Sequence, residues 1–163
     1  MSAGAEAQYV TFGVGAETFA APVSLVREIL DYREAFRIPN GPAYLLGLTD
    51  VRGRGVPTVD LRVRLGLPAA APTLQTRIIV LDAPLQDRVL SLGLVADRVH
   101  EVIAIQSDQI EPAPEIGVPW RSEYIAGVVR REQGFVVLID IARLFTSREA
   151  AGLESAAEQT FAA

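Results

Sequence analysis

One stretch of the sequence occurs twice, and this repeat limits the chain to folds that contain two similar halves. Seven residues of the segment 44–61 are matched 80 positions later by the same residue or by a close apolar substitute. The matched pairs are Tyr44 and Tyr124, Leu45 and Ile125, Gly47 and Gly127, Val56 and Val136, Val59 and Ile139, Asp60 and Asp140, and Leu61 and Ile141. An upstream motif, Val26-Arg27-Glu28-Ile29-Leu30, is matched by Val99-His100-Glu101-Val102-Ile103 at an offset of 73. The sequence therefore predicts two matched halves, with seven extra residues between the two motifs in the second half.

The first copy of the repeat has the pattern of a β-hairpin. Residues 46–65 read LGLTDVRGRGVPTVDLRVRL, in which Gly53 and Gly55 flank a single arginine. Glycine supplies the positive φ angles that a tight turn requires, and the apolar residues on either side supply a buried face. We therefore expect a turn over Gly53 to Gly55, with Arg52 at the end of the hairpin and a short helix over 61–65 after it.

Segments with alternating or β-branched residues predict about ten short strands. The expected strands are 9–14, 18–21, 28–30, the two arms of the first hairpin, 76–81, 89–95, 99–105, 124–130 and 135–140, the last two joined by a turn over 132–134. Between the second and third strands we expect a brief helical turn over Ser24 to Val26, and a helix from Pro22 to Leu30 is the alternative. The run Asn40-Gly41-Pro42 indicates a short helix over Ala43 to Leu45.

The remaining segments mark the ends and connections of the domain. Residues 1–8 are expected to lack ordered structure, and a connector is expected near 66–75. Residues 110–119 hold three prolines and are expected to form a loop. The terminal segment 146–163 is rich in Ala and Glu, and it predicts a surface helix from Ser147 to Phe161 whose one aliphatic anchor is Leu153.

Ten strands in two matched groups favour an all-β fold. Half of the residues are hydrophobic, so a chain of 163 residues can bury a sizeable core. Short strands in such patterns close into small barrels or sandwiches because closure removes exposed sheet edges. We therefore expect residues 9–145 to form a single domain of two small β-barrels packed on one another, followed by the terminal helix.

The composition excludes several functional classes. All 15 basic side chains are arginine, and 20 acidic ones give a net charge of −5, which argues against a nucleic-acid surface because phosphate binding needs a basic stripe. Without cysteine the chain has no disulfide, thiolate metal site or cysteine nucleophile. Without lysine it has neither a phosphate-binding loop of the Gly-Lys-Thr type nor a Schiff-base nucleophile. No secretory signal and no apolar run of about 20 residues is found, so we expect a cytoplasmic protein without membrane insertion.

The polar residues favour structural roles over catalysis. His100 is the only histidine and has no second His or Cys to share a metal or a proton. Asp60 and Asp140 each precede a short helix, and a repeated helix cap explains them better than a catalytic acid pair. Glu28 and Glu101 lie on strands between apolar neighbours, so we expect both to point to the opposite face, toward solvent.

Arg52 allows two interpretations. It sits where the first hairpin turns, and its counterpart in the second copy is Glu132, so the repeat does not retain it. It could form a salt bridge with Asp50 or Glu28. It could also be a recognition arginine on a protein-binding face, where arginine is enriched.

Two runs carry a resemblance to a known family. The run Gly47-Leu48-Thr49-Asp50-Val51-Arg52-Gly53, followed by Val56-Pro57-Thr58-Val59-Asp60-Leu61-Arg62, resembles the CheW signature G-x-x-N-x-R-G and V-P-x-x-D-L-R. CheW proteins are the coupling proteins of bacterial chemosensory arrays. Further matches are Val26-Arg27-Glu28-Ile29, Arg37-Ile38-Pro39-Asn40, Thr76-Arg77-Ile78-Ile79-Val80, Gly93-Leu94-Val95-Ala96-Asp97-Arg98-Val99, Ile110-Glu111-Pro112-Ala113-Pro114-Glu115 and Glu123-Tyr124-Ile125-Ala126-Gly127. The resemblance runs in unbroken order from Tyr9 to Phe145.

The resemblance implies two intertwined SH3-like five-stranded β-barrels and a non-enzymatic adaptor without cofactor or metal. Such an adaptor joins the cytoplasmic tip of methyl-accepting chemoreceptors to the regulatory domain of the histidine kinase CheA, in arrays at the membrane and with possible ring contacts to CheW-like domains. In that family the receptor tip, a helical hairpin, docks in an apolar groove between the barrels. By position, the expected receptor-binding residues are Val26, Glu28, Arg52, Val95 and Val99. The expected kinase-binding residues are Ala35 and Phe36.

One position departs from the family pattern, because Asp50 stands where Asn is usual. The carboxylate removes two donors and adds a charge near Arg52, so it could hold that arginine or alter partner choice. Two other functions stay open at this point. One is an adaptor in a chemosensory pathway that controls pili or gene expression, and the other is a small-barrel ligand-binding module. The latter would require a pocket with convergent polar groups, which we find no pattern for in the sequence.

Overall fold

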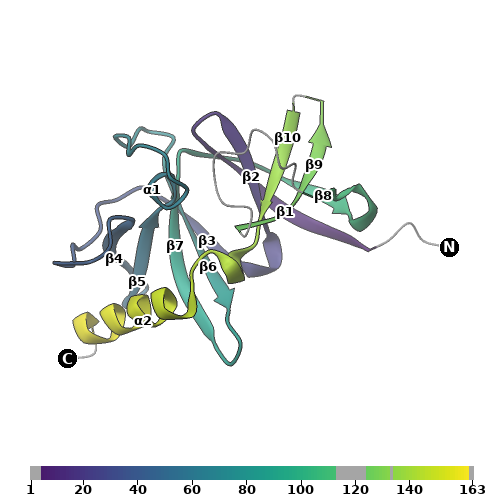
Figure 1. The fold of residues 1–163 in the computed structure, drawn as a ribbon. Coiled ribbons are helices and arrows are strands. Elements are labelled where there is room, and N and C mark those ends of the chain that lie inside the picture. Colours follow the sequence, from purple (N-terminus) through teal and green to yellow (C-terminus); the bar gives the residue numbers. More distant parts are fainter. Residues whose placement is uncertain (1–4, 113–123, 133, 162–163) are drawn as a thin grey trace.

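The fold consists of two five-stranded sheets with short helices and one longer terminal helix, as the computed structural model shows (Figure 1). The structure describes residues 5–112, 124–132 and 134–161. The strands are β1 (Glu6–Val14), β2 (Glu17–Pro22), β3 (Val26–Asp31), β4 (Leu45–Val51), β5 (Arg54–Asp60), β6 (Arg77–Pro84), β7 (Val89–Ala96), β8 (Arg98–Gln106), β9 (Ile125–Arg131) and β10 (Gly134–Ile139). The helices are α1 (Leu61–Arg64), α2 (Ser147–Phe161) and the 3-10 turns η1 (Val23–Leu25), η2 (Ser107–Gln109) and η4 (Ile141–Arg143).

The two halves of the sequence exchange their first hairpins. One sheet, called barrel A here, has the order β8-β1-β2-β10-β9, and the other, barrel B, has the order β3-β6-β7-β5-β4. The first half therefore gives β1 and β2 to barrel A and β3 to β5 to barrel B. The second half gives β6 and β7 to barrel B and β8 to β10 to barrel A. In both sheets the exchanged hairpin is joined by a parallel pair, β2 with β10 and β7 with β5. This exchange is what makes the expected SH3-like subdomains intertwined.

Each sheet is closed into a barrel by the segment that follows one of its edge strands, β3 in barrel B and β8 in barrel A. After β3 the chain returns to β4, where Phe36 and Leu48 exchange two backbone hydrogen bonds of 2.7 and 2.8 Å. After β8 the same exchange joins Glu111 and Val128, both at 2.8 Å. Leu48 and Val128 are 80 positions apart, so the closing contact belongs to the repeat. Closure leaves few unpaired edge groups, which is the advantage of a barrel.

The closing contact also explains a repeated glycine. A Cβ at Gly47 would lie 2.1 Å from the carbonyl oxygen of Phe36, and the residue has a φ of +144°. A Cβ at Gly127 would lie 2.5 Å from Cγ2 of Ile110 and 3.0 Å from the carbonyl oxygen of Glu111. Only glycine lets the crossing backbone come this close.

The largest cluster of buried residues lies between the barrels. Phe12 and Phe19 of barrel A and Ile79, Leu92 and Leu94 of barrel B all belong to it. Each barrel has a smaller cluster of its own inside. These are Ala20, Ile103, Ile105, Val129, Val136 and Leu138 in barrel A, and Val51, Val56, Ile78 and Val80 in barrel B. The sheets are thus apolar on both faces, and the two barrels share one core.

The terminal helix belongs to the chain of barrel A but packs on barrel B. It follows β10 and η4, and it contacts β5 (Figure 1). Leu153 is buried as expected, and Ala150 is buried beside it. Glu154 adds an ion pair with Arg88 in the β6–β7 hairpin, at 2.7 Å. The helix therefore joins the two barrels.

Several local predictions were wrong by small amounts. The first hairpin turns at Arg52 and Gly53, with φ of 55° and 84°, because Val51 pairs with Arg54 and leaves a two-residue loop. The segment 43–45 forms a turn and not a helix, since the backbone already enters β4 at Leu45. β1 begins at Glu6, which pairs with Gln106, so Glu6 to Gln8 are not disordered. The helical turn before β3 begins at Val23, one residue earlier than expected, and the strand that follows confirms the choice against a long helix.

Candidate protein-interaction site

Glu28 of β3 and Arg52 of the β4–β5 turn are brought together at one end of barrel B, called its mouth here. Nε of Arg52 donates to Oε2 of Glu28 at 3.1 Å, which selects Glu28 from the two partners considered for this arginine. This hydrogen bond, with the charge of Glu28, raises the pKa of Arg52. The Glu28 side chain is 25% exposed and that of Arg52 is 81% exposed, so the acid anchors an arginine that stays open to solvent.

The expectation that Glu28 faces solvent was wrong because the face of the sheet to which it points is the interior of barrel B. Between Val26, which lies opposite Leu81, and Glu28, which lies opposite Val80, the register shifts by one residue. Glu28 therefore lies on the same face of the sheet as Val80, inside barrel B, and Ile29 is the residue left exposed.

Asp50 holds the hairpin turn and does not hold Arg52. Its Oδ1 accepts the backbone N–H of Gly53 at 2.9 Å, and its backbone carbonyl accepts a hydrogen bond from Arg33. An asparagine could make the same contact with Gly53 through its own side-chain oxygen. The departure from the family pattern at this position thus leaves the turn intact and adds one negative charge beside it.

The three valines expected at the receptor site fall into two groups. Val26 and Val99 pack against the central core from the edge strands β3 and β8, where they lie opposite Leu81 and Phe12. Val95 lies opposite Ile78 and packs inside barrel B. The structure therefore brings Val26 and Val99 to the junction of the barrels, while Val95 shares the barrel B interior with the face of Glu28.

Sequence analysis missed two exposed apolar residues beside these valines. Ile29 is 40% exposed and Val102 is 54% exposed, and the two are counterparts in the repeat. Ile29 lies opposite Ile79 of the central core, and Val102 lies opposite Val10. Each edge strand thus carries a partly buried valine and an exposed aliphatic residue on the face that turns toward the other barrel. The signal was present in the upstream repeat, because both copies carry an aliphatic residue at this position.

The expected kinase-binding residues lie on the chain that closes barrel B. Phe36 is 63% exposed, although its backbone N–H and its carbonyl are both hydrogen-bonded to Leu48. Ala35 beside it is partly buried. A large apolar side chain held outward by a fixed backbone is a suitable anchor for a partner. Phe36 and Ala35 belong to one barrel only.

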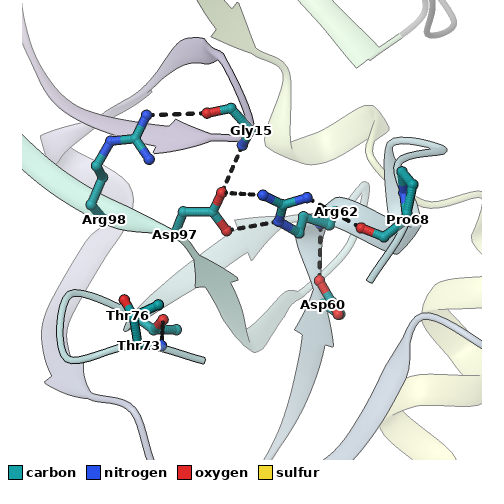
Figure 2. Close-up of polar contacts among 8 residues, drawn as sticks. All are labelled: Gly15, Asp60, Arg62, Pro68, Thr73, Thr76, Asp97 and Arg98. Carbon is teal, nitrogen blue, oxygen red and sulfur yellow. Dashed lines mark hydrogen bonds and ion pairs between the residues drawn. The ribbon is translucent and has the colours of Figure 1, made fainter. Parts of the chain in front are cut away.

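Sequence analysis also missed an ion-pair cluster that joins the barrels (Figure 2). Nε and Nη2 of Arg62, in α1, donate to the two carboxylate oxygens of Asp97 at 2.9 and 2.8 Å. Asp97 also accepts the backbone N–H of Gly15, in the β1–β2 turn, at 2.7 Å. Arg98 donates to the carbonyl of Gly15 at 3.1 Å. Arg62 and Asp97 both lie in the runs that resemble the family, so the signature includes residues that hold the fold.

The two carboxylates of this cluster have opposite pKa shifts. Burial alone would raise the pKa of Asp97, but the hydrogen bonds from Arg62 and from the Gly15 N–H lower it. Burial raises the pKa of Asp60, against the hydrogen bonds of its helix cap. Asp60 accepts the N–H of Arg62 at 3.0 Å, as expected for a cap. Asp140 makes no side-chain cap to η4, so the cap prediction was wrong for the second copy.

An open cavity of about 930 Å³ lies in barrel A, where the sequence offered no pattern for a pocket. Thr11, Thr18 and Glu101 line it together with the buried Ile103 and Val136. The hydroxyl of Thr11 donates to the carbonyl of Glu101 at 2.8 Å and accepts its N–H at 3.1 Å. These two bonds satisfy the backbone at a bulge that repeats the one at Glu28.

The described residues show no group of acids and histidines that could hold a metal ion. His100 is exposed at the rim of the cavity in barrel A, beside Glu101. Within the described ranges, no helix has the length and apolar character needed to cross a membrane.

Comparison with known proteins identifies the family. The family model described as CheW-like domain matches residues 8–149. Chemotaxis protein CheW of Rhizobium meliloti (strain 1021) is 34% identical over 142 residues, which cover 87% of this chain and 89% of the relative. Protein PilI of Pseudomonas aeruginosa is 29% identical over 132 residues, covering 78% of this chain and 70% of the relative. The crystal structure of scaffolding protein TtCheW from Thermoanaerobacter tengcongensis superposes with a TM-score of 0.78 at 25% identity, covering 89% of this chain and 91% of that chain. The chain therefore belongs to the CheW family.

Proposed function

We propose that this protein is a non-enzymatic scaffold that couples the cytoplasmic tips of chemoreceptors to a CheA-type histidine kinase. It would act in the cytoplasm, at membrane-associated receptor arrays. Membership in the CheW family and the name of its relative, chemotaxis protein CheW, support this proposal. The matched relative is covered over 89% of its length, so the likeness extends over nearly the whole adaptor.

The observation that carries the receptor half of the proposal is the pair of apolar edges between the barrels. Val26 and Ile29 of β3 face Leu81 and Ile79 of the central core, and their repeat counterparts on β8 are arranged in the same way. Two such edges suit a helical hairpin, which presents apolar residues along one face of each helix. Arg52 and Glu28 would add a charged rim that sets register and orientation.

The kinase half of the proposal uses a different surface. Phe36 would anchor the regulatory domain of the kinase, since its backbone is fixed and most of its side chain is exposed. Receptor and kinase would then bind the same molecule at once. Contacts with CheW-like domains in a ring would come in addition.

The likeness to PilI favours a second candidate within the same class. The protein would then be the adaptor of a chemosensory pathway that controls pili or gene expression. The receptor groove and the kinase anchor would be the same, and only the identity of the partners would differ.

A pull-down from lysate of the native cells tests the proposal and separates the two candidates. The protein serves as bait and the retained partners are identified by mass spectrometry. We expect a chemoreceptor and a CheA-type kinase together, and the genes beside that kinase would show which pathway is served. A folded bait that retains neither partner would contradict the proposal.

Two substitutions test the groove assignment. Val26→Asp should abolish binding of a purified receptor cytoplasmic fragment while binding of the kinase regulatory domain is retained. Ile29→Asp should weaken receptor binding about tenfold or more, with less risk to the fold because Ile29 is more exposed. Val89→Asp, at an exposed apolar residue of β7, is the matched control. Loss of both partners in a folded Ile29→Asp variant would count against the groove.

A further inference from the structure

Arg64 lies in a cage formed by both barrels and by the terminal helix. Its guanidinium carbon is 5.0 Å from the ring centroid of Tyr44, 4.9 Å from that of Tyr124 and 5.0 Å from that of Phe145. Its Nη2 donates to the carbonyl of Leu144 at 2.7 Å and to Glu149 of α2 at 3.0 Å. These contacts combine cation–π attraction, a backbone hydrogen bond and an ion pair on one side chain.

The cage lies where the two copies of the repeat meet. Tyr44 and Tyr124 are repeat counterparts, and their backbone carbonyls accept equivalent 2.8 Å hydrogen bonds from Asp60 and Asp140. The guanidinium is almost equally distant from these two equivalent rings. The counterpart of Arg64 itself is Leu144, whose backbone carbonyl accepts hydrogen bonds from Nε and Nη2 of Arg64. A single arginine therefore contacts the equivalent tyrosines of both copies.

The partners of Arg64 come from chain segments that would otherwise move with different barrels. Tyr44 leads into β4 of barrel B, and Tyr124 leads into β9 of barrel A. Glu149 lies in the first turn of α2, where its carboxylate also accepts the N–H of Thr146 at 2.9 Å, and its own N–H donates to the Thr146 hydroxyl at 3.1 Å. This capping box fixes the carboxylate that meets the arginine.

The geometry requires an arginine and not any cation. The Arg64 side chain is only 12% exposed, so its charge must be met by partners within the protein. A planar guanidinium can contact several rings and still bond a carbonyl and a carboxylate through its edge. An ammonium is a point charge and could satisfy only part of this set.

We propose that Arg64 is a positioning residue that fixes the angle between the two barrels, and so sets the width of the groove between them. The second part rests on the proposed function, because the groove is the surface that would receive the receptor tip. Val26 and Ile29 come from barrel B, and Val99 and Val102 come from barrel A. Any change in the angle between the barrels therefore changes the spacing of the two apolar edges.

The angle can be measured without any partner. The chain contains no cysteine, so cysteines introduced at exposed Arg54 in barrel B and exposed Ala104 in barrel A can be spin-labelled selectively. Pulsed electron paramagnetic resonance then gives the distance distribution between the barrels. We expect a narrow distribution with Arg64 and a broader or shifted one in Arg64→Met, which keeps much of the packing but loses the charge. An unchanged distribution would overturn the proposal.

Binding provides the second readout. Arg64→Met should weaken binding of the receptor cytoplasmic fragment about five- to tenfold, as a lost coupling of moderate size predicts. Binding of the kinase regulatory domain should be unchanged, because Ala35 and Phe36 lie within barrel B alone. An equal loss for both partners would indicate a merely structural role. Failure of the unmodified protein to bind receptor would refute the proposed function, while the distance measurement would still decide on Arg64.

Two further variants keep the test decisive if Arg64→Met folds poorly. Arg64→Lys retains the ion pair with Glu149 and should give an intermediate width of the distance distribution. Arg143→Met changes an exposed arginine outside the cage and should match the unmodified protein in both readouts. A distribution for Arg64→Lys as narrow as that for arginine would show that charge alone suffices and would contradict the cage.

Discussion

The two barrels share one backbone plan but differ at their mouths. In barrel B the acid on the edge strand, Glu28, meets Arg52 from the hairpin turn. In barrel A the equivalent positions carry Glu101 and Glu132, two like charges that cannot pair, and both line the open cavity. The residues beside Glu28 and Glu101 on the neighbouring strands differ as well. Val80, opposite Glu28, is apolar, whereas Thr11, at the corresponding bulge, donates a hydrogen bond from its hydroxyl to the backbone carbonyl of Glu101.

The comparison shows which parts of the repeat are fixed by folding. The closing hydrogen bonds, the crossing glycines and the tyrosines of the cage occur in both copies. The residues at the hairpin turns and after the last strand differ, and among the described residues only the first copy pairs an arginine of the turn with the glutamate of the edge strand. Backbone crossings tolerate little change, while a turn residue exposed to solvent is free to take a new role. The rim of barrel B is therefore the better candidate for recognition.

The largest effect is expected where the crossing is tightest. Gly47→Ala places a Cβ against a backbone carbonyl at a positive φ, so we expect it to lower the free energy of unfolding by about 3–5 kcal/mol. Gly127→Ala meets the movable end of Ile110 first and has no positive φ to strain, so about 1–2 kcal/mol is expected. Urea unfolding of both variants measures the difference. Equal losses would show that the two crossings are equivalent after all.

A medium effect is expected at the ion-pair cluster of Figure 2. Asp97→Asn should cost about 1–3 kcal/mol near neutral pH, because Arg62 would lose its charged partner in a partly buried site. The folded-state pKa of Asp97 is lowered, so its stabilisation is present above the ordinary value of 3.8 and is lost as the pH falls through the folded value. The stability difference between the unmodified protein and the variant should therefore shrink in acid.

An exposed ion pair in the second copy provides the control for this cluster. Arg143 and Asp140 are 3.9 Å apart at the surface, so Arg143→Ala should leave the urea midpoint almost unchanged. A large loss at Arg143, or an Asp97→Asn penalty that does not diminish toward low pH, would contradict the account of the cluster.

The smallest effect on the fold is expected at the rim itself. Arg52→Glu should leave the melting temperature nearly unchanged, since the side chain is mostly exposed, but it should weaken receptor or kinase coupling about tenfold. Glu132→Arg places the missing cation beside Glu101 and should leave coupling unaffected. Binding titrations with thermal melts compare the two variants. A large fall in melting temperature for Arg52→Glu would make Arg52 a structural residue.

Sequence reasoning predicted the architecture well because the repeat reports directly on the backbone. Ten strands, the two matched barrels, the terminal helix and the cap at Asp60 followed from periodicity, glycine placement and the family resemblance. The position of Arg52 at the hairpin turn also indicated its two possible partners. The exchange of hairpins between the halves was implied by the resemblance and not by the repeat itself.

The rest depends on contacts that a linear pattern does not contain. Alternation placed Glu28 and Ile29 on opposite faces, but the face of Glu28 is the interior of barrel B and not a solvated surface. Arg62 pairs with Asp97, 35 positions away in the chain, and Arg64 pairs with Glu149, 85 positions away. Neither spacing matches the period of a helix, a strand or the repeat. The cavity in barrel A is lined by residues of β1, β2, β8, β9 and β10, which are far apart in the sequence.

We propose that one molecule of this protein holds a receptor tip and a kinase regulatory domain at the same time. Sedimentation velocity on the three purified components tests it directly. We predict a complex that contains all three and sediments faster than either pair, and that reverts to the kinase pair alone with Ile29→Asp. Two separate pairs that compete with each other, and never form a three-part complex, would contradict the account.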